Sequence, residues 1–295
     1  MRIYLLIFIV LFSTNAFSKV KVFTTTTNLA DVARQIGGDQ VVVESLCKGT
    51  QDPHYLEAKP SYTFKLSKAD LLISIGADLE VGWLPLVIRG SRNPNIREGQ
   101  PGHLVASSVV SLLGKDSDNT SRSMGDVHPE GNPHFMLSPL RSVDVARAVS
   151  KKLTELRPEH SNFFRQRLNN YELKIKKMLK ILRRNISIGK KVITYHKTLT
   201  YFYDDFRIEN IDVLEPKPGV PPSAAHIMNV IKKIKKFKVK TIVIENYFDD
   251  AIAKRIKRDV PEVEIAIVPV TVEGQDGISS IFDLYEYLAK RIGGQ

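Results

Sequence analysis

The feature that most constrains the fold of this chain is an alternation of β-branched runs with amphipathic helical segments, which occurs twice. In the first half, strands are predicted from VKVFTTT, VVVESLC and ADLLISIGA, and a helix from NLADVARQIGG, with Gly37 and Gly38 as its stop signal. In the second half, strands are predicted from KKVITYH, IENIDVLE, KTIVIEN and VEIAIVPV, with helices at about 222–237 and 250–258 between the later ones. Such alternation forms parallel sheets that carry helices on both faces.

Between the two halves lies a long helical region, with a break or bend expected near Pro158. We therefore expect an α/β protein of two lobes, each a parallel sheet flanked by helices, joined by a long rigid helix. The expected divisions are an N-terminal lobe at 19–141, a linking helical region at 142–186 and a C-terminal lobe at 187–295. A long connecting helix resists bending, so small movements of loops are expected and not wide closure of the lobes.

The first 18 residues, MRIYLLIFIVLFSTNAFS, predict the compartment. They contain one Arg, an apolar run from Ile3 to Phe12 and small residues at Ala16 and Ser18, which is typical of a cleaved signal peptide. The apolar run is shorter than a membrane span. We expect cleavage after Ser18 and a mature protein in the periplasm. The only cysteine is Cys47, so neither a disulfide framework nor a lipid-modified cysteine at the junction is expected.

The formal net charge of +11 raises the question of nucleic-acid binding. The basic residues concentrate in two segments, KKLTELRPEHSNFFRQRLNNYELKIKKMLKILRR and IKKIKKFKVK, where they alternate with Leu, Ile and Phe at helical spacing. This pattern is typical of solvated helix faces. Because aromatic and basic residues do not form shared platforms, nucleic acid is not an expected partner.

Potential metal ligands follow several of the predicted strands. His54 follows VVVESLC, His196 ends KKVITYH and Glu245 lies at the end of KTIVIEN. The loop GDVHPEGNPHFMLSP adds His128 and His134, and its Gly, Pro and Asn residues favour a backbone that is held in place. Ligands of open parallel sheets lie beyond the carboxyl ends of the strands. We therefore expect imidazoles and a carboxylate to converge at one site.

The same segments resemble those of a known family. DPHYLEAKPS and NPHFMLSP are similar to two conserved segments of the metal-binding receptors of zinc and manganese ABC importers, and HKTLTYFYDDF resembles the segment that supplies the third ligand there. IGADLEVGWLP resembles the strand, loop and helix that follow the first ligand loop of the family. The resemblance covers most of the mature chain in the same order. It implies two α/β lobes bridged by a rigid helix, with the metal between them.

The resemblance implies His54, His134 and His196 as metal ligands, the first two from the N-terminal lobe and the third from the C-terminal lobe. It gives no ready fourth ligand. Where relatives have an Asp after the last strand, this chain has VPVTVEGQDG, which offers Glu273 at about the expected place, next to Val272, and Asp276 only with a shift.

We favour Glu245 as the fourth ligand over Glu273 and Asp276, because its strand should lie beside the strand that ends at His196. The role of His128 stays open at this point. The segment KDSDNTSRSMGDVHPEG contains no other histidine and therefore differs from the long His-rich loop of some zinc-specific members.

Three imidazoles and a carboxylate favour Zn²⁺, with Mn²⁺ or Fe²⁺ as alternatives, because Mn²⁺ more naturally recruits additional carboxylate oxygen. We therefore expect a monomeric periplasmic solute-binding protein, not an enzyme, that delivers a divalent transition metal to the membrane permease of an ABC importer. The alternative is an exported zinc hydrolase that uses the same three histidines, with Glu245 as general base. The absence of an HExxH motif counts against it.

Overall fold

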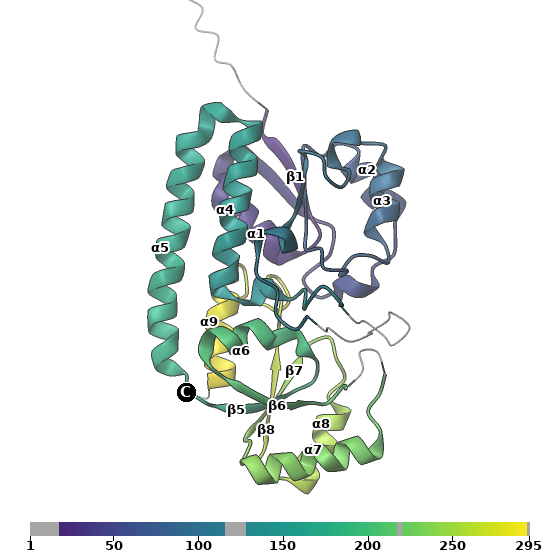
Figure 1. Ribbon diagram of the computed structural model, residues 1–295, viewed down its shortest axis with the longest axis vertical. Helices are drawn as coiled ribbons and strands as arrows, with labels where there is room; N and C mark the ends of the chain where they lie inside the picture. Colours follow the sequence, from purple (N-terminus) through teal and green to yellow (C-terminus); the bar gives the residue numbers. More distant parts are fainter. Residues whose placement is uncertain (1–17, 116–127, 217–219, 294–295) are drawn as a thin grey trace, which may run out of the picture.

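The computed structural model describes residues 18–115, 128–216 and 220–293, so residues 1–17 of the expected signal peptide lie outside it. The described chain contains two four-stranded sheets whose paired strands all run parallel, one sheet in each half (Figure 1). The strand orders are β2-β1-β3-β4 and β6-β5-β7-β8. The prediction of two α/β lobes is confirmed. None of the helices in these ranges is both long and apolar enough to cross a membrane.

The central strands are buried on both faces, as expected for strands covered by helices. In β7, for example, all five residues are buried. The strands are β1 (Val20–Thr24), β2 (Val41–Ser45), β3 (Leu71–Ser74), β4 (His103–Val105), β5 (Lys191–Thr194), β6 (Glu209–Val213), β7 (Thr241–Glu245) and β8 (Glu264–Val268).

Several helices begin at a side chain that caps free backbone N–H groups. The hydroxyl oxygen of Ser138 accepts a hydrogen bond from the Arg141 N–H at the start of α4, and that of Ser223 accepts one from the His226 N–H at the start of α7. The helices are α1 (Thr27–Gly37), α2 (Pro60–Leu66), α3 (Leu84–Ser91), α4 (Pro139–Leu156), α5 (Ser161–Asn185), α6 (Thr200–Phe206), α7 (Ala224–Phe237), α8 (Ala251–Asp259) and α9 (Ile281–Gly293).

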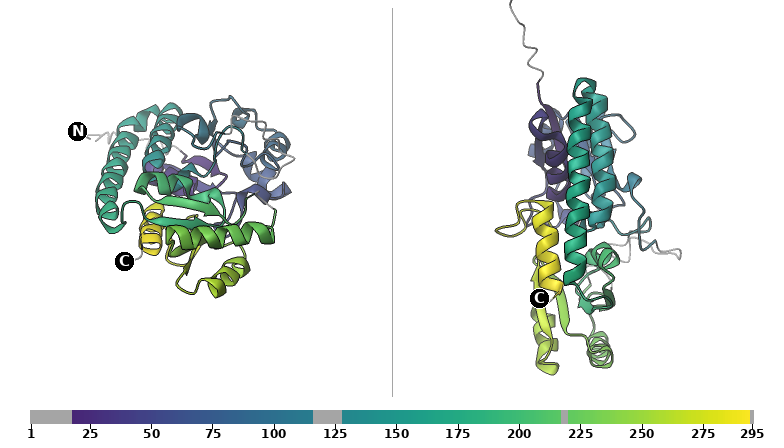
Figure 2. Two further views of the ribbon diagram at one scale, coloured as in Figure 1. Left: turned by 60° about the horizontal axis from the view of Figure 1, so that its bottom comes forward. Right: turned by 90° about the vertical axis from the view of Figure 1, so that its left-hand side faces the viewer.

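The linking region is a pair of helices. The expected break lies at the short turn Pro158–His160, where Pro158 cannot continue α4. Figures 1 and 2 show α4 and α5 side by side, joined at the top of the molecule, so that α5 alone extends down to the C-terminal lobe. With 25 residues, α5 is the long helix that joins the lobes.

The N-terminal sheet has one strand more than the sequence predicts. The additional strand, β4, pairs with β3 through three residues, beginning with His103 beside Leu72. A strand of three residues is too short to show the alternation by which strands are recognised. This edge strand nevertheless completes a sheet of the same size as the one in the C-terminal lobe.

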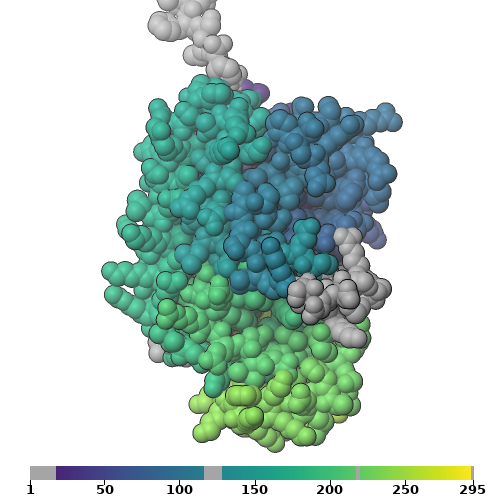
Figure 3. All heavy atoms as spheres, viewed as in Figure 1, coloured from purple at the N-terminus to yellow at the C-terminus, as the bar shows by residue number. Residues whose placement is uncertain are grey.

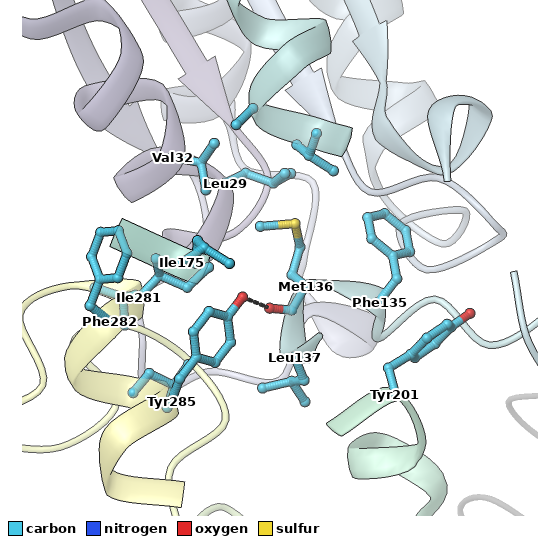
Figure 4. Close-up of a cluster of buried hydrophobic side chains, with 14 of the residues drawn as sticks. Leu29, Val32, Phe135, Met136, Leu137, Ile175, Tyr201, Ile281, Phe282 and Tyr285 are labelled. Atoms are coloured by element: carbon cyan, nitrogen blue, oxygen red, sulfur yellow. Dashed lines mark hydrogen bonds between the residues drawn. The ribbon is translucent and has the colours of Figure 1, made fainter. Parts of the chain in front are cut away.

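One of the hydrophobic clusters continues from one lobe into the other. It includes residues of α1, of the segment before α4, of α5 and of α9. Figure 4 shows Tyr285 of α9 beside Met136, and the Tyr285 hydroxyl donates a hydrogen bond of 2.7 Å to the Met136 carbonyl. Because Tyr285 and Met136 are both buried, separating the lobes would expose apolar surface that is now shielded.

Polar contacts also join the lobes at the start of α1. The Asn28 side chain donates to the Val270 carbonyl at 3.1 Å and accepts from the Val272 N–H at 2.7 Å. Close by, the Thr271 hydroxyl donates to the Gly49 carbonyl. A Cβ atom on Gly49 would lie 2.4 Å from the Val272 carbonyl oxygen, so the two backbones touch. The lobes meet over a broad contact in the space-filling view (Figure 3).

Candidate metal centre

The first predicted ligand, His54, lies in the short turn Pro53–Tyr55, in the loop that follows β2. The Asp52 carboxylate accepts hydrogen bonds from the His54 backbone N–H at 3.0 Å and from its ring Nδ1–H at 2.6 Å. The Trp83 indole N–H donates to the Pro53 carbonyl at 2.9 Å and fixes the turn against the core. Since a carboxylate accepts at Nδ1, the Nε2 atom of neutral His54 keeps its lone pair for a ligand.

The second predicted ligand, His134, is held by the Pro- and Asn-rich loop before α4. The Asn132 side chain accepts from the His134 N–H at 2.9 Å and donates to the Lys197 carbonyl of the other lobe at 2.8 Å. The Nε2 atom of His134 is buried and has no hydrogen-bond partner. Burial lowers the pKa of His134 well below its usual value, so the ring is neutral at neutral pH.

The C-terminal lobe places its polar groups at the ends of neighbouring strands. Thr194 of β5 pairs with both Val213 and Val243, so His196, Glu215 and Glu245 follow at the same level. This pairing confirms the prediction that the strands ending at His196 and Glu245 are neighbours in the sheet. The Glu215 carboxylate accepts from the Nδ1–H of His196 at 3.0 Å, which leaves Nε2 of the neutral ring as the acceptor.

Glu245 is fully buried at the end of β7. Neither of its carboxylate oxygens has a hydrogen-bond partner among the described residues. Burial raises the pKa of Glu245 to about 7, although the nearby Thr198 hydroxyl and, to a smaller extent, His196 oppose the shift. An unpartnered buried acid is costly, and such groups concentrate at functional sites.

The three predicted histidines come together at the contact between the lobes. The ring centroids are 5.3 Å apart for His54 and His134, 5.9 Å for His134 and His196, and 6.5 Å for His54 and His196. Across the described parts of the chain, however, no three His, Cys, Asp or Glu side chains are already arranged as a group that could hold a metal ion. The site is therefore a cluster of imidazoles and not a finished coordination sphere.

The two other candidates for the fourth ligand point elsewhere. The Glu273 side chain is 56% exposed and forms an ion pair with Arg34 at 3.7 Å. Asp276 is also exposed. Of the three carboxylates considered, only Glu245 is buried close to His196.

The structure adds His128 to the cluster, a residue whose role the sequence left open. Its Nδ1 lies 3.0 Å from the Ala77 carbonyl oxygen, and its Nε2 lies 3.3 Å from Nε2 of His54. The centroid of its ring is 6.5 Å from that of His134. The only signal in the sequence was a second histidine in the same loop as His134.

Two parallel α/β lobes with a histidine cluster where they meet form an architecture that is typical of two-lobed receptors. The family model described as zinc-uptake complex component A, periplasmic, matches residues 22–293. The chain belongs to this family, the substrate-binding proteins of metal ABC transporters. The match is to receptors and not to enzymes, so it gives the hydrolase alternative no support.

Individual relatives are distant but cover nearly the whole chain. The chain is 26% identical over 274 residues to the manganese ABC transporter substrate-binding lipoprotein PsaA of Streptococcus pneumoniae, covering 90% of this chain and 86% of the relative. It is 24% identical to the metal ABC transporter substrate-binding lipoprotein SloC of Streptococcus mutans, covering 88% and 85%.

Solved structures show the same fold. A crystal structure of ZnuA has a TM-score of 0.75 at 20% identity and covers 93% of this chain and 100% of that one. A manganese-bound periplasmic metal-binding protein from Candidatus Liberibacter asiaticus has a TM-score of 0.77 at 20% identity, covering 93% and 98%. Relatives named for manganese and relatives named for zinc therefore share this architecture.

Proposed function

We propose that the protein captures Zn²⁺ in the periplasm and delivers it, as a monomer, to the membrane permease of an ABC importer. The observation that carries this proposal is the buried, unpartnered Nε2 atom of His134 between His54 and His196. A buried nitrogen lone pair without a partner is costly, and a metal ion bound there would remove the cost.

The groups behind two of the rings support the same proposal. Asp52 and Glu215 each accept a hydrogen bond from Nδ1–H of a histidine, His54 and His196 respectively. A carboxylate behind an imidazole fixes its tautomer and makes Nε2 a stronger donor to a metal. Histidines that ligate a metal almost always donate their other ring N–H to a carboxylate, a backbone carbonyl or water.

The ligand set that we propose from the sequence is His54, His134, His196 and Glu245. Three neutral imidazoles leave one position of a tetrahedral ion to be filled, and Glu245 is the donor that the sequence predicts for it. Nitrogen-rich sets favour Zn²⁺ over Mn²⁺, which prefers oxygen ligands and binds least tightly among the divalent ions of its row. Zinc is therefore the proposed cargo, with Mn²⁺ and Fe²⁺ as the alternatives.

Competitive metal loading tests the choice of cargo. The purified mature chain is dialysed against equal concentrations of Zn²⁺, Mn²⁺ and Fe²⁺ without oxygen, and its metal content is measured by elemental analysis. We expect one zinc per chain, no retained metal in His134→Ala, and normal loading in His160→Ala, whose histidine lies in the turn between α4 and α5. Retention of manganese in place of zinc would contradict the proposed cargo, and retention of no metal would contradict the proposed function.

Coordination number separates a receptor from a hydrolase. X-ray absorption of the zinc-loaded protein should show a closed set of four protein ligands, whereas a hydrolase keeps one position open for water. Zinc uptake by cells that lack the gene should be restored by the wild-type chain and not by His134→Ala. Uptake that is equal with both chains would contradict the proposed delivery to an importer.

A further inference from the structure

The second half of α5 carries charge of one sign on its exposed surface. Residues 173–185 include six basic residues and no acidic residue. All six basic side chains are exposed, namely Lys174, Lys176, Lys177, Lys180, Arg183 and Arg184. Figures 1 and 2 place α5 at the outer edge of the molecule. We call the exposed surface of residues 173–185 the basic face of α5.

Contacts within the protein leave most of this charge unbalanced. The Lys174 ammonium lies 3.7 Å from the centre of the Phe282 ring, and the Arg183 side chain donates a hydrogen bond of 3.2 Å to the Asp205 carbonyl. The other four basic side chains form no ion pair with any residue of the described ranges. Their charges are therefore available to a partner from outside.

The arrangement of the cations is unfavourable for the helix alone. Glu172, the acid that precedes the basic face, is already paired with Arg147 at 2.8 Å. Lys176 and Lys180 are four residues apart, as are Lys180 and Arg184, so like charges face each other from turn to turn. The helix dipole favours cations in the last turn only, and Lys176 lies more than two turns before the end of the helix. An anionic surface would relieve this repulsion.

Apolar side chains lie among the cations. Leu173 is 54% exposed and Ile181 is 59% exposed. Ile181 borders an open hollow between α5 and α9, which Glu286 and Lys290 also line. A face that serves only solubility has no need of exposed Leu and Ile. A basic amphipathic helix on a lipid bilayer, in contrast, places its cations at anionic headgroups and its apolar side chains among the acyl chains.

We propose that the basic face of α5 docks on the surface of a lipid bilayer that contains anionic phospholipids. Leu173, Lys177, Lys180 and Arg184 follow one another at spacings of four, three and four residues, so they lie along one line of the helix and can touch a flat surface together. A second copy of the chain does not fit, because two such faces repel each other. The choice of a bilayer rests on the proposed function, since an importer lies in a membrane and docking would keep the receptor near it.

Vesicle binding tests the docking. The mature chain is sedimented at about 0.1 M salt with vesicles of phosphatidylglycerol and phosphatidylcholine in equal parts, or of phosphatidylcholine alone. We expect binding to the anionic vesicles only. Lys177→Glu combined with Lys180→Glu should weaken this binding at least about 10-fold. The matched control is Lys232→Glu combined with Lys235→Glu on α7, an exposed pair with the same spacing and the same change in charge, which should weaken binding less than about 3-fold.

The outcomes separate the inference from its rivals. Equal weakening by both pairs would overturn it, because net charge alone would then drive the binding. Absence of wild-type binding to the anionic vesicles would also overturn it, and retention of the wild type on immobilised polyglutamate would then assign the face to an acidic protein. Failure of the proposed function would appear instead as absence of bound zinc in the wild-type chain, which vesicle binding does not require.

A second test concerns the apolar side chains. At about 0.5 M salt the attraction between charges is screened, so the binding that remains depends on apolar contact. Leu173→Asn combined with Ile181→Asn should abolish this remaining binding. The control Leu86→Asn, whose side chain is 55% exposed on α3, should keep it. Remaining binding that is equal in all three proteins, or absent from the wild type, would overturn the insertion of these side chains into the bilayer.

Discussion

The two lobes bring different chemistry to the same centre by different structural means. The N-terminal lobe supplies His54, His128 and His134 from irregular loops, which are held by hydrogen bonds of their own. The C-terminal lobe supplies His196 and Glu245 at the ends of paired strands. The comparison teaches that hydrogen-bonded loops position the imidazoles of the N-terminal lobe, whereas strand pairing positions one imidazole and one buried carboxylate in the C-terminal lobe.

The lobes also differ in how pH acts on their buried groups. Burial lowers the pKa of His134 and raises that of Glu245, so in both cases the neutral form is favoured. Lowering the pH protonates His134 and makes it positively charged, whereas raising the pH deprotonates Glu245 and makes it negatively charged. These two groups are therefore expected to lower the stability of the protein at opposite ends of the pH range.

The largest effect is expected when one imidazole is removed from each lobe in turn. His134→Ala and His196→Ala should each weaken zinc binding by about 1000-fold, about 4 kcal/mol, because each removes a ligand that no neighbour replaces. Calorimetry with a competing chelator measures such affinities. If His196→Ala bound zinc as tightly as the wild type, the N-terminal lobe alone would hold the ion and the contrast between the lobes would fail.

A smaller effect is expected from Glu245→Gln on the stability of the metal-free protein, which is prepared with a chelator. The folded pKa of Glu245, about 7, lies above the unfolded value of 4.5, so the folded state binds more protons between these values and stability falls as pH rises through them. Gln carries no charge. Between pH 5 and pH 8 the variant should gain about 2 to 3 kcal/mol relative to wild type, as measured by urea unfolding.

The exposed Glu273 offers the matched control for this measurement. Glu273→Gln should follow the wild-type pH profile, since a surface ion pair such as that with Arg34 contributes little. An equal gain in both variants would show that the effect comes from overall charge and not from burial at the site.

The contact between the lobes is the next target. Gly49→Ala should lower the free energy of unfolding by about 2 kcal/mol, because its Cβ would meet the backbone of Val272 and Glu273 and overpacking costs about 1–3 kcal/mol. Gly82→Ala is the control, since the nearest atom to its Cβ is 3.9 Å away. Thermal unfolding measures both variants. Equal stability would mean that the lobes part at this contact with little cost.

The smallest effect is expected at His103 of β4, which is outside the metal centre. Burial lowers the pKa of His103 to about 4, below the unfolded value of 6.5, so stability is lost as pH falls below 6.5. His103→Gln should reduce this acid loss by about 1 to 2 kcal/mol at pH 5, as measured by urea unfolding at pH 7.5 and pH 5. If His103→Gln lost as much stability between pH 7.5 and pH 5 as the wild type does, another group would be responsible for the loss, and His134 is the next candidate.

The sequence predicts the C-terminal half of the site better than the N-terminal half. His196 and Glu245 follow from strand ends, because parallel pairing places successive strand ends at one edge of the sheet. His128 could not be placed in the same way, because its position depends on the path of a loop and on a contact with the Ala77 carbonyl oxygen. Periodicity carries no information about such a path.

The same limit applies to the fold. The two rounds of strand–helix alternation predict the two parallel sheets and their helices. They do not predict β4 or the reversal of chain direction between α4 and α5. The three residues of β4 have no period to detect. Pro158 marks the break in the linking region but does not give the direction in which the chain continues.

The contact of Asn28 and Gly49 with residues 270–272 bears on how long the protein keeps its cargo. A receptor whose lobes are tied on one side cannot shed an ion by swinging apart along that side. At the proposed site, the residence time of the metal would be set by the loops that carry the imidazoles. Rapid unloading at the membrane would require the permease to displace those loops, so the importer, and not the receptor, would determine when the ion leaves.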